Sequence, residues 1–594
     1  MPGILHHLSA FLIAACFLTA KVLCEDTSTP PNVIIIMTDE QNLRTIGAYR
    51  DLMSNEQAFQ WGQNVFVDTP NIDRLANEGV IFDNFYAVTP LCTPSRASFM
   101  TGLYPKQTGA WKNHGTLKKN KHSFAEDLMD THDTVYLGKW HLNGVTKDST
   151  DFNNNPNRKF GFKNTSFQYN RGHWKYFSQE KWKVTAYDWS QRGMFANNEE
   201  QNYATDFLFD KAISFMKNKK DKGKNFAVML SIADPHAPNE VRAPYNEMYN
   251  HISFQLPSTG KKAMRLNPAL PDWGQVDTFS PETAESNISD WENDTVLQKG
   301  MQNVFGMIKL IDDNVGKMLQ FFDDENLADD TIVIFTSDHG DMMGEHGRLN
   351  KGVPYKASAQ VPMIMRWPNK IDSGKIIKTA YSSVDFAPSL LGMMSVEAKN
   401  INSSGIDGSS EIMRSGQISF NEEQIRFLTD SKMKRWAAAI TGQYKLVLSK
   451  DGPWLFDMIK DPDEMINYYE DPKYTQLAST LKNALIDTID KFNFPLKQRS
   501  YLADTPECWD SKNEISGWDN NLCSDLNDIQ NRPACQWDFV SSQCPRVCGE
   551  CCHDSSGEFW LFKAMRTCAE IQEEERFCQH SAAQLFCPES CGLC

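Results

Sequence analysis

Four short apolar segments, each followed at once by polar residues, constrain the fold of this chain most strongly. They are Asn32–Met37, Thr134–Leu137, Phe226–Ile232 and Thr331–Thr336. Continuous apolar runs of this length indicate strands that are buried on both faces of a sheet. A parallel sheet with helices on both sides provides such positions. We therefore predict an α/β fold over residues 31–400, built on a large, mostly parallel sheet sandwiched by helices.

The residues after these four segments are ones that bind ions or move protons. They are Asp39-Glu40-Gln41, Lys139-Trp140-His141, Asp234-Pro235-His236 and Asp338-His339. In sheets of parallel strands, ligands bind beyond the carboxyl ends of the strands. A single strand followed by such residues would mean little, but four of them predict one convergent polar site at this edge.

The pattern changes after residue 400. The segments 436–441, 444–448 and 454–457 resemble short strands of a meander, and a turn at Asp461–Glu464 follows. We predict a smaller antiparallel sheet within residues 401–494, closed by a helix over 479–492. Residues 495–507 form a predicted linker.

The C-terminal part is an internal repeat of cysteines. Twelve of the 15 cysteines lie between Cys508 and Cys594, in two units, 508–551 and 552–594, that end in the same Cys-Pro-x-x-Cys-Gly-x-Cys spacing. Units this small cannot bury a sufficient apolar core, so we expect disulfides to hold them together. The spacing does not choose among the possible pairings. Zinc binding is the weaker alternative, because paired C-x-x-C half-sites are lacking.

The N-terminal apolar run Leu8–Ala20 is too short to span a bilayer comfortably and resembles the core of a signal peptide. We expect residues 1–24 to be removed, which makes the protein secreted or lumenal; a signal anchor is the alternative. Four N-glycosylation sequons, at Asn164, Asn287, Asn293 and Asn402, agree with this route.

The net charge and the number of cysteines limit the classes of function that this chain can have. The net charge of −16 argues against nucleic acid or an anionic membrane as the main partner, although a local basic pocket could still take an anionic substrate. With Cys16 and Cys24 removed and twelve cysteines in the tail, Cys92 has no evident disulfide partner. Such a cysteine is either buried and inert or a chemical tool.

The cysteine units resemble two tandem ShKT domains, the fold of sea-anemone potassium-channel toxins. The toxins' Lys-Tyr pair would lie between the third and fourth cysteines, but the loops 536–543 and 579–586 do not contain it. The resemblance therefore implies an accessory or tethering module with a surface or matrix partner, rather than a channel blocker.

The segments Cys92–Arg96 (CTPSR), Thr101–Pro105 (TGLYP) and Gly138–Leu142 (GKWHL) resemble the signatures of type I sulfatases of the alkaline-phosphatase superfamily. The resemblance covers about residues 31–492. It implies that a formylglycine-generating enzyme oxidises Cys92 to formylglycine during secretion. One hydroxyl of the hydrated aldehyde attacks sulfur, and deprotonation of the second expels sulfate and restores the aldehyde.

The same resemblance implies roles for residues around Cys92. Arg96 lies one helical turn after Cys92, on the same face. Lys139 and Lys351 match lysines that contact the sulfate and stabilise its developing charge. His141 matches the histidine that assists deprotonation of the diol, and His236 matches the acid toward the leaving alcohol. His114 and His346 are expected to be structural or to line the substrate pocket.

A calcium site is the second implication. It would use Asp39, Glu40, Asp338 and His339 together with Cys92, since Ca²⁺ prefers hard oxygen ligands. Glu40 stands where the family usually has Asp, and Gln41 is an alternative for that position. His339 is a softer ligand than calcium prefers. Helix N-capping is the alternative role for Asp39 and Asp338.

We therefore predict a secreted, calcium-dependent sulfuric ester hydrolase, with a sulfated glycan as the substrate that analogy suggests. A phosphatase or phosphodiesterase of the same superfamily is one alternative, although such enzymes usually carry Ser or Thr in place of Cys92. A non-catalytic binding or matrix protein that uses the ShKT pair is another, but Lys139, His141 and His236 are all present. A third is an active enzyme that its tail localises to a surface or matrix.

Overall fold

The structure is a computed structural model that describes residues 30–144, 158–177, 203–263, 291–399, 403–432, 435–449 and 452–494. It also describes a short hairpin in the tail, β16 (Phe559–Leu561) and β17 (Ala564–Arg566). The predicted signal peptide (1–24), the linker (495–507) and, apart from this hairpin, the two cysteine modules (508–551 and 552–594) lie outside the described residues. In the part that is described, helices are either too short or too polar to cross a membrane.

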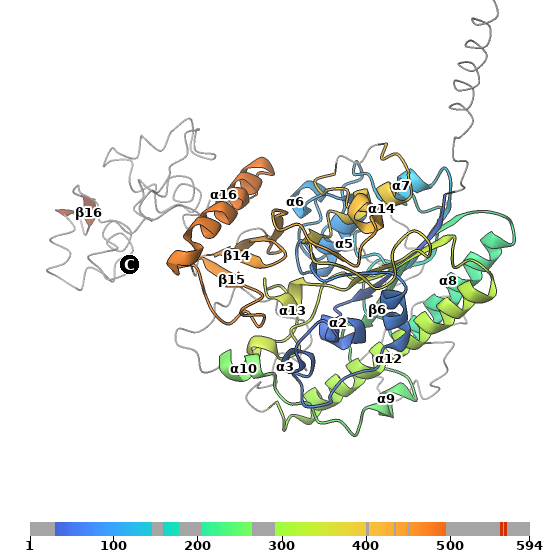
Figure 1. The fold of residues 1–594 in the computed structure, drawn as a ribbon, viewed down its shortest axis with the longest axis horizontal. Helices are drawn as coiled ribbons and strands as arrows, with labels where there is room; N and C mark the ends of the chain where they lie inside the picture. The colour runs from blue at the N-terminus through green and yellow to red at the C-terminus, as the bar shows by residue number, and fades with distance from the viewer. Residues whose placement is uncertain are drawn as a thin grey trace, which may run out of the picture.

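A central sheet of nine strands organises the described part of the chain (Figure 1). Its strand order is β11-β9-β2-β8-β7-β1-β6-β4-β5. All neighbours are parallel except β8, which is antiparallel to both β7 and β2. The predicted large, mostly parallel sheet is therefore confirmed. The strands are β1 (Asn32–Asp39), β2 (Val80–Phe82), β4 (Asp133–Lys139), β5 (Asn164–Tyr169), β6 (Phe226–Pro235), β7 (Thr331–Ser337), β8 (Met363–Arg366), β9 (Lys375–Ile377) and β11 (Ile418–Ser419).

Strand β1 shows why the apolar runs are continuous. Side chains alternate between the two faces of a strand. Ile34 and Ile36 join one apolar core with residues of α8 and α12, whereas Val33 and Ile35 join a second core with residues of α5 and α14. Figure 1 shows these helix pairs on opposite sides of the sheet. The helices are α5 (Cys92–Thr101), α8 (Ala204–Lys220), α12 (Thr295–Asp324) and α14 (Phe386–Met393).

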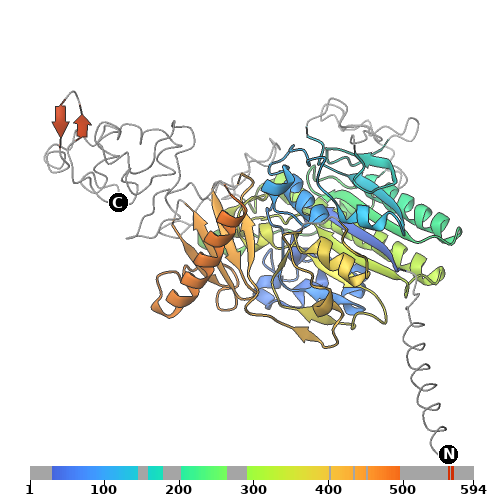
Figure 2. The same cartoon turned by 90° about the horizontal axis from the view of Figure 1, so that it is seen from above.

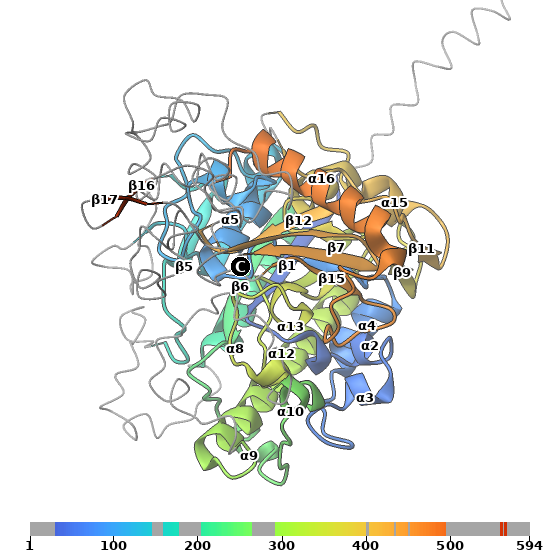
Figure 3. The same cartoon turned by 90° about the vertical axis from the view of Figure 1, so that its left-hand side faces the viewer.

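A second, smaller sheet is antiparallel, as predicted. It consists of β12 (Arg426–Thr429), β13 (Trp436–Ile440), β14 (Tyr444–Ser449) and β15 (Trp454–Asp457). One face packs on α16 and the other on residues of the large domain. Figures 1 and 2 place this sheet and α16 at one end of the large sheet, and Figure 3 shows them in front of it.

The small sheet occupies only part of the interval 401–494. Helix α15 (Ser409–Met413) still contacts α14, and β11 pairs with β9 at the edge of the large sheet. These elements are too short to show a periodic apolar pattern. The closing helix α16 (Thr475–Lys491) begins before the predicted residue 479.

The remaining elements are short connections around the two sheets. They are η1 (Leu43–Thr45), α2 (Gly47–Arg50), α3 (Asn55–Ala58), α4 (Pro70–Asn77), β3 (Phe85–Tyr86), α6 (Pro105–Thr108), α7 (Phe124–Leu128), α9 (Tyr245–Met248), α10 (Ser258–Ala263), η5 (Glu345–Gly347), α13 (Lys356–Ala359), β10 (Tyr381–Ser382) and η6 (Pro472–Tyr474).

The four predicted segments lie side by side in the middle of the large sheet. Strand β1 pairs with β7 on one side and with β6 on the other, and β6 pairs with β4. Because these four strands are parallel, their carboxyl ends meet at one edge. A register shift between Met37 and Asp39 sets Asp39 opposite Pro235, and the backbone N–H of Asp338 donates to Thr38 O at 3.2 Å. The predicted convergence of polar residues is thus confirmed.

Candidate functional site

Cys92 is the first residue of α5, and its side chain lies at the sheet edge. It is 1% exposed and is the free cysteine of the described residues. Its Sγ lies 3.2 Å from His339 Nε2 and 3.7 Å from Asp39 Oδ1. The helix therefore begins directly over the carboxyl ends of β1 and β7.

Arg96, one turn further along α5, ties these strand ends together. Its Nε donates to Asp338 Oδ2 at 2.8 Å, and one terminal nitrogen donates to Asp39 Oδ2 at 3.3 Å. The other terminal nitrogen donates to Lys139 O at 3.1 Å and to Ser231 Oγ at 2.5 Å. Burial would lower the pKa of Arg96, but Asp338 and Asp39 raise it. The guanidinium is thus a fixed charge that orients two buried carboxylates.

A group of side chains suited to a cation surrounds Cys92. Ligand atoms of Asp39, Cys92, Asp338 and His339 all lie within 4.8 Å of one another. Since a carbonyl can only accept a hydrogen bond, His339 donates from Nδ1 to Gly340 O at 2.9 Å, so that Nε2 faces the group. Burial would lower the pKa of His339, but Asp338 and Cys92 raise it to about 9. The group attracts positive charge, and four of the five predicted metal ligands belong to it.

Glu40, the fifth predicted ligand, does not belong to this group of four, and its role as a metal ligand stays a prediction. Its Oε2 accepts from Lys351 Nζ at 2.7 Å and lies 2.8 Å from His236 Nε2. Burial would raise the pKa of Glu40, but His236 and Lys351 hold it well below its usual range. The backbone of Glu40 is in the left-handed region (φ 64°), which is uncommon for a residue other than glycine. The alternative residue, Gln41, is buried; its Nε2 donates to Thr45 Oγ1, while its Oε1 has no hydrogen-bond partner among the described residues. Gln41 therefore stays an alternative ligand.

Two histidines from different strand ends complete this edge. The rings of His173 and His236 stack with centroids 3.5 Å apart, and both belong to a second group of possible ligands with Asp39 and Cys92. Lys139 Nζ lies 2.7 Å from His173 Nε2 and also forms an ion pair with Asp39. The sequence reasoning missed His173. It follows β5, which ends at the same edge, but β5 is too polar to stand out as a buried strand.

His141 lies close to the start of α5. The hydroxyl of Thr93, the residue after Cys92, donates to the backbone carbonyl of His141 at 2.9 Å. Its Nε2 is 3.4 Å from His114 Nδ1, and its buried Nδ1 has no hydrogen-bond partner among the described residues. Burial lowers the pKa of His141 well below its usual value. The structure therefore brings the predicted catalytic residues to one edge of the sheet, with His114 as a neighbour.

The loop after β7, which carries Asp338, His339 and Lys351, is held by a buried carboxylate. Glu345 accepts from the Arg44 guanidinium at 3.0 Å and from Gln60 Nε2 at 2.8 Å. A buried ion pair with further hydrogen bonds has little freedom to rearrange. This contact therefore fixes the loop against the segment that follows β1.

The chain is similar to several known proteins. The family model described as Sulfatase matches residues 31–396, and the model described as N-sulphoglucosamine sulphohydrolase, C-terminal, matches residues 344–491. N-acetylglucosamine-6-O-sulfatase of Bacteroides thetaiotaomicron is 27% identical over 546 residues, which cover 81% of this chain and 89% of the relative. Ulvan-active sulfatase of Formosa agariphila is 26% identical, and the match covers 80% of this chain and 84% of the relative.

One similar solved structure is a protein in complex with its substrate D-glucosamine-2-N,6-O-disulfate. It has a TM-score of 0.59 and 24% identity, and the match covers 78% of this chain and 98% of that one. At this identity the likeness shows a shared fold. It includes the mixed α/β architecture with a large and a small sheet.

His346 provides a prediction about stability and pH. Its ring stacks on Tyr355 with centroids 3.7 Å apart, and burial lowers its pKa to about 3, although Glu345 raises it. Below pH 6.5 the unfolded chain then binds a proton that the folded chain does not. We expect the contribution of the neutral His346 to the free energy of unfolding to be complete above pH 6.5. It should be lost as the pH falls toward 3, by up to about 1.4 kcal/mol per pH unit.

Chemical unfolding of the variant His346→Phe at pH 7, 6, 5 and 4 checks this expectation. The variant should lose less stability on acidification than the wild type, because the phenylalanine keeps the stacking and has no proton to bind. His251→Phe, at an exposed position, is the matched control and should follow the wild type. Equal acid sensitivity of His346→Phe and wild type would contradict the assignment.

Proposed function

This chain belongs to the sulfatase family, and from that premise we propose that it is a secreted sulfatase that hydrolyses sulfate esters of a glycan, with residue 92 as the nucleophile. The observation that carries this proposal is the placement of Cys92. Its Sγ lies within 4.8 Å of ligand atoms of Asp39, His236 and His339. A buried cysteine surrounded by carboxylates and imidazoles at a strand-end site is suited to chemistry rather than to packing.

Oxidation of Cys92 to formylglycine would supply a nucleophile that can also release the bound sulfate. A thiol could attack sulfur, but the cysteine side chain carries no hydroxyl whose deprotonation would expel the sulfate. The environment fits the modified residue, because His339 Nε2 and Asp39 Oδ1 lie beside its terminal atom. The formylglycine-generating enzyme of the secretory pathway is the partner that this proposal requires.

The two lysines would bind the sulfate group. Lys139 and Lys351 approach the edge from opposite sides, since Lys139 lies at the end of β4 and Lys351 in the loop after β7. Both side chains are buried, at 0% and 2% exposure. Fixed, desolvated positive charges stabilise negative charge that develops on sulfate oxygens as the ester bond breaks.

His236 would give a proton to the leaving alcohol. Its Nδ1 donates to Ala237 O at 2.8 Å, so a transferable proton must reside on Nε2, which faces Glu40 and Lys351. Burial lowers the pKa of His236 and makes it a stronger acid, although Glu40 opposes the shift. His141, with its low pKa, would take the proton whose loss from the nucleophile releases sulfate. Roles of this kind each contribute about 10²–10⁴-fold to the rate.

We propose that Asp39, Asp338, His339 and residue 92 hold one Ca²⁺. The two carboxylates are the hard oxygen ligands that calcium prefers. A bound divalent cation would polarise a coordinated oxygen and offset the charge of the incoming sulfate. The chain's own contribution is to hold the ligands, which Arg96 does through both carboxylates.

The substrate class rests on the relatives, whose names refer to N-acetylglucosamine 6-O-sulfate and to ulvan. We propose a sulfated glycan for this chain as well. The two C-terminal cysteine modules would be disulfide-bonded ShKT domains that localise the enzyme to a surface or matrix outside the cell.

Peptide mass spectrometry of the protein secreted from its own type of cell tests the nucleophile. The peptide with residue 92 should carry an aldehyde in place of the thiol, and the tail cysteines should be recovered as disulfides without reduction. Cys92→Ala should lower hydrolysis of a small aryl sulfate by at least about 10³-fold. An unmodified thiol at residue 92 in a fully active enzyme would contradict the proposal.

Calcium removal tests the metal site. Chelation should lower both activity and the thermal midpoint, and Ca²⁺ at a hundredfold excess over its Kd should restore about 2–3 kcal/mol of stability. Asp338→Asn should respond less to calcium, whereas Asp324→Asn, at an exposed position on α12, should respond like wild type. A midpoint that is the same in chelator and in calcium would contradict a site at Asp338.

A further inference from the structure

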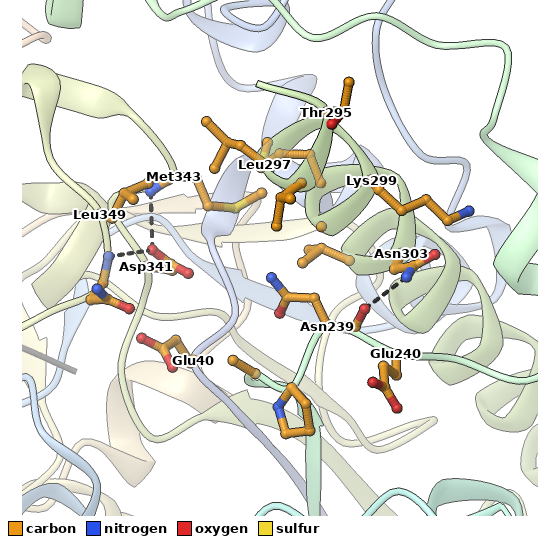
Figure 4. A pocket seen from close by; sticks show the side chains of 17 residues that line it. Glu40, Asn239, Glu240, Thr295, Leu297, Lys299, Asn303, Asp341, Met343 and Leu349 are labelled. Carbon is orange, nitrogen blue, oxygen red and sulfur yellow. Dashed lines mark hydrogen bonds between the residues drawn. The ribbon is translucent and has the colours of Figure 1, made fainter. Parts of the chain in front are cut away.

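A cavity of about 360 Å³ opens beside the groups that face the leaving alcohol (Figure 4). Three segments form its walls: residues 237–240 after β6, the first part of α12 (residues 295–304), and residues 341–350 after β7. These segments adjoin His236 and Lys351 in the chain. Since His236 would give its proton to the leaving group, a leaving group released there would occupy this cavity.

Two buried acceptors in the cavity wall lack donors. Glu40 is 4% exposed, and its Oε1 has no hydrogen-bond partner among the described residues. Asn303 is 9% exposed; its Nδ2 donates to Asn239 O at 2.7 Å, while its Oδ1 is likewise unpartnered. Buried acceptors are normally paired, because leaving one unpaired is unfavourable. Both oxygens are therefore suited to hydroxyl or ammonium donors of a ligand.

Three acidic side chains, those of Glu40, Glu240 and Asp341, line the cavity. Burial, together with the nearby Glu40, raises the pKa of Asp341 to about 7, so this side chain is partly protonated near neutral pH. Backbone N–H groups of Met343 and Asn350 hold Asp341 Oδ1 at 3.0 and 2.9 Å, and Figure 4 shows this carboxylate directed toward the cavity.

Lys299 is the cation among the described lining residues. Its Nζ already contacts Asn246 O and Asn250 Oδ1, each at 2.6 Å. Lys351 is likewise engaged, because its Nζ donates to Glu40 Oε2 at 2.7 Å. A ligand carboxylate would consequently meet acidic side chains and cations that already have partners.

Apolar side chains also line the cavity. Leu297, Met301 and Val304 of α12 face the cavity together with Met343 and Leu349 of the loop after β7. Pockets for small ligands commonly combine such an apolar lining with a few oriented polar groups. A sugar ring matches this combination, because it presents a face of C–H groups and an edge of hydroxyls.

We propose that this cavity holds the sugar unit that bears the sulfate, and that it selects a neutral or amino hexose over a hexuronate. Asn303 and Glu40 set the preference by accepting from hydroxyl or ammonium groups, and the acidic side chains of Glu40, Glu240 and Asp341 disfavour a ligand carboxylate. This assignment rests on the proposed sulfatase activity and adds the class of sugar.

The wild-type enzyme provides the first test. We measure kcat/KM for glucosamine 6-sulfate, galactose 6-sulfate, a 2-sulfated hexuronate and a small aryl sulfate. The two hexose esters should exceed the hexuronate by at least about a hundredfold, the scale of a carboxylate placed near like charges. A hexuronate that is hydrolysed as well as the hexoses overturns the proposal.

Binding of the sulfate-free sugars separates this proposal from the activity itself. Titrations of glucosamine and glucuronate, followed by calorimetry or ligand NMR, should show binding of glucosamine alone. If glucosamine binds but no sulfate ester is hydrolysed, the proposed function fails and the sugar preference stands. If the aryl sulfate is hydrolysed and glucuronate binds at least as well as glucosamine, the preference fails and the activity stands.

Asn303→Leu tests the wall directly, because it removes the acceptor and keeps the size of the side chain. The ratio of kcat/KM for the hexose ester to that for the aryl sulfate should fall about tenfold, mainly through KM, as loss of one or two hydrogen bonds implies. Gln320→Leu, an amide change at an exposed position of the same helix, should leave that ratio unchanged. An unchanged ratio in Asn303→Leu would exclude Asn303 as a determinant of the sugar preference. If this variant does not fold, the comparison of substrates with the wild-type enzyme tests the preference.

Discussion

A buried guanidinium, that of Arg96, is the contact on which the site depends. It donates to carboxylates at the ends of two strands, to a backbone carbonyl at the end of a third and to a hydroxyl on the fourth. Buried carboxylates without such a partner would be strongly unfavourable, and removing one member of a buried ion pair costs about 3–5 kcal/mol. The same contact fixes α5 over the sheet edge, and α5 begins with Cys92. The position of the nucleophile is therefore coupled to the position of the cation ligands.

A second coupling joins the chemistry to the recognition of the sugar. Glu40 contacts Lys351 and His236 with one carboxylate oxygen, while its other oxygen is left for the adjoining cavity. Lys351 would bind the sulfate, and His236 would protonate the leaving alcohol. A sugar that donates to Glu40 would thus be aligned with both groups at once. Glu40 would therefore connect the two sites.

The sequence was most informative where the chain is most buried. The apolar runs before Asp39, Lys139, His236 and Asp338 revealed the central strands, because both faces of those strands are covered. The parallel arrangement then brought their polar ends together without further information. What could not be predicted depended on details of the backbone. Glu40 adopts a left-handed conformation, His173 follows a strand with too few apolar residues, and β11 pairs over only two residues. None of these features leaves a periodic signal.

The central claim is that residue 92 attacks the sulfate group and needs a second hydroxyl to release it. Cys92→Ser tests this claim most directly, because serine can attack but has no second hydroxyl on the same carbon. After incubation with a sulfate ester, mass spectrometry should find one sulfate group on residue 92, with one equivalent of alcohol released and no further turnover. Sustained turnover by this variant, or a retained sulfate at any other residue, would contradict the account.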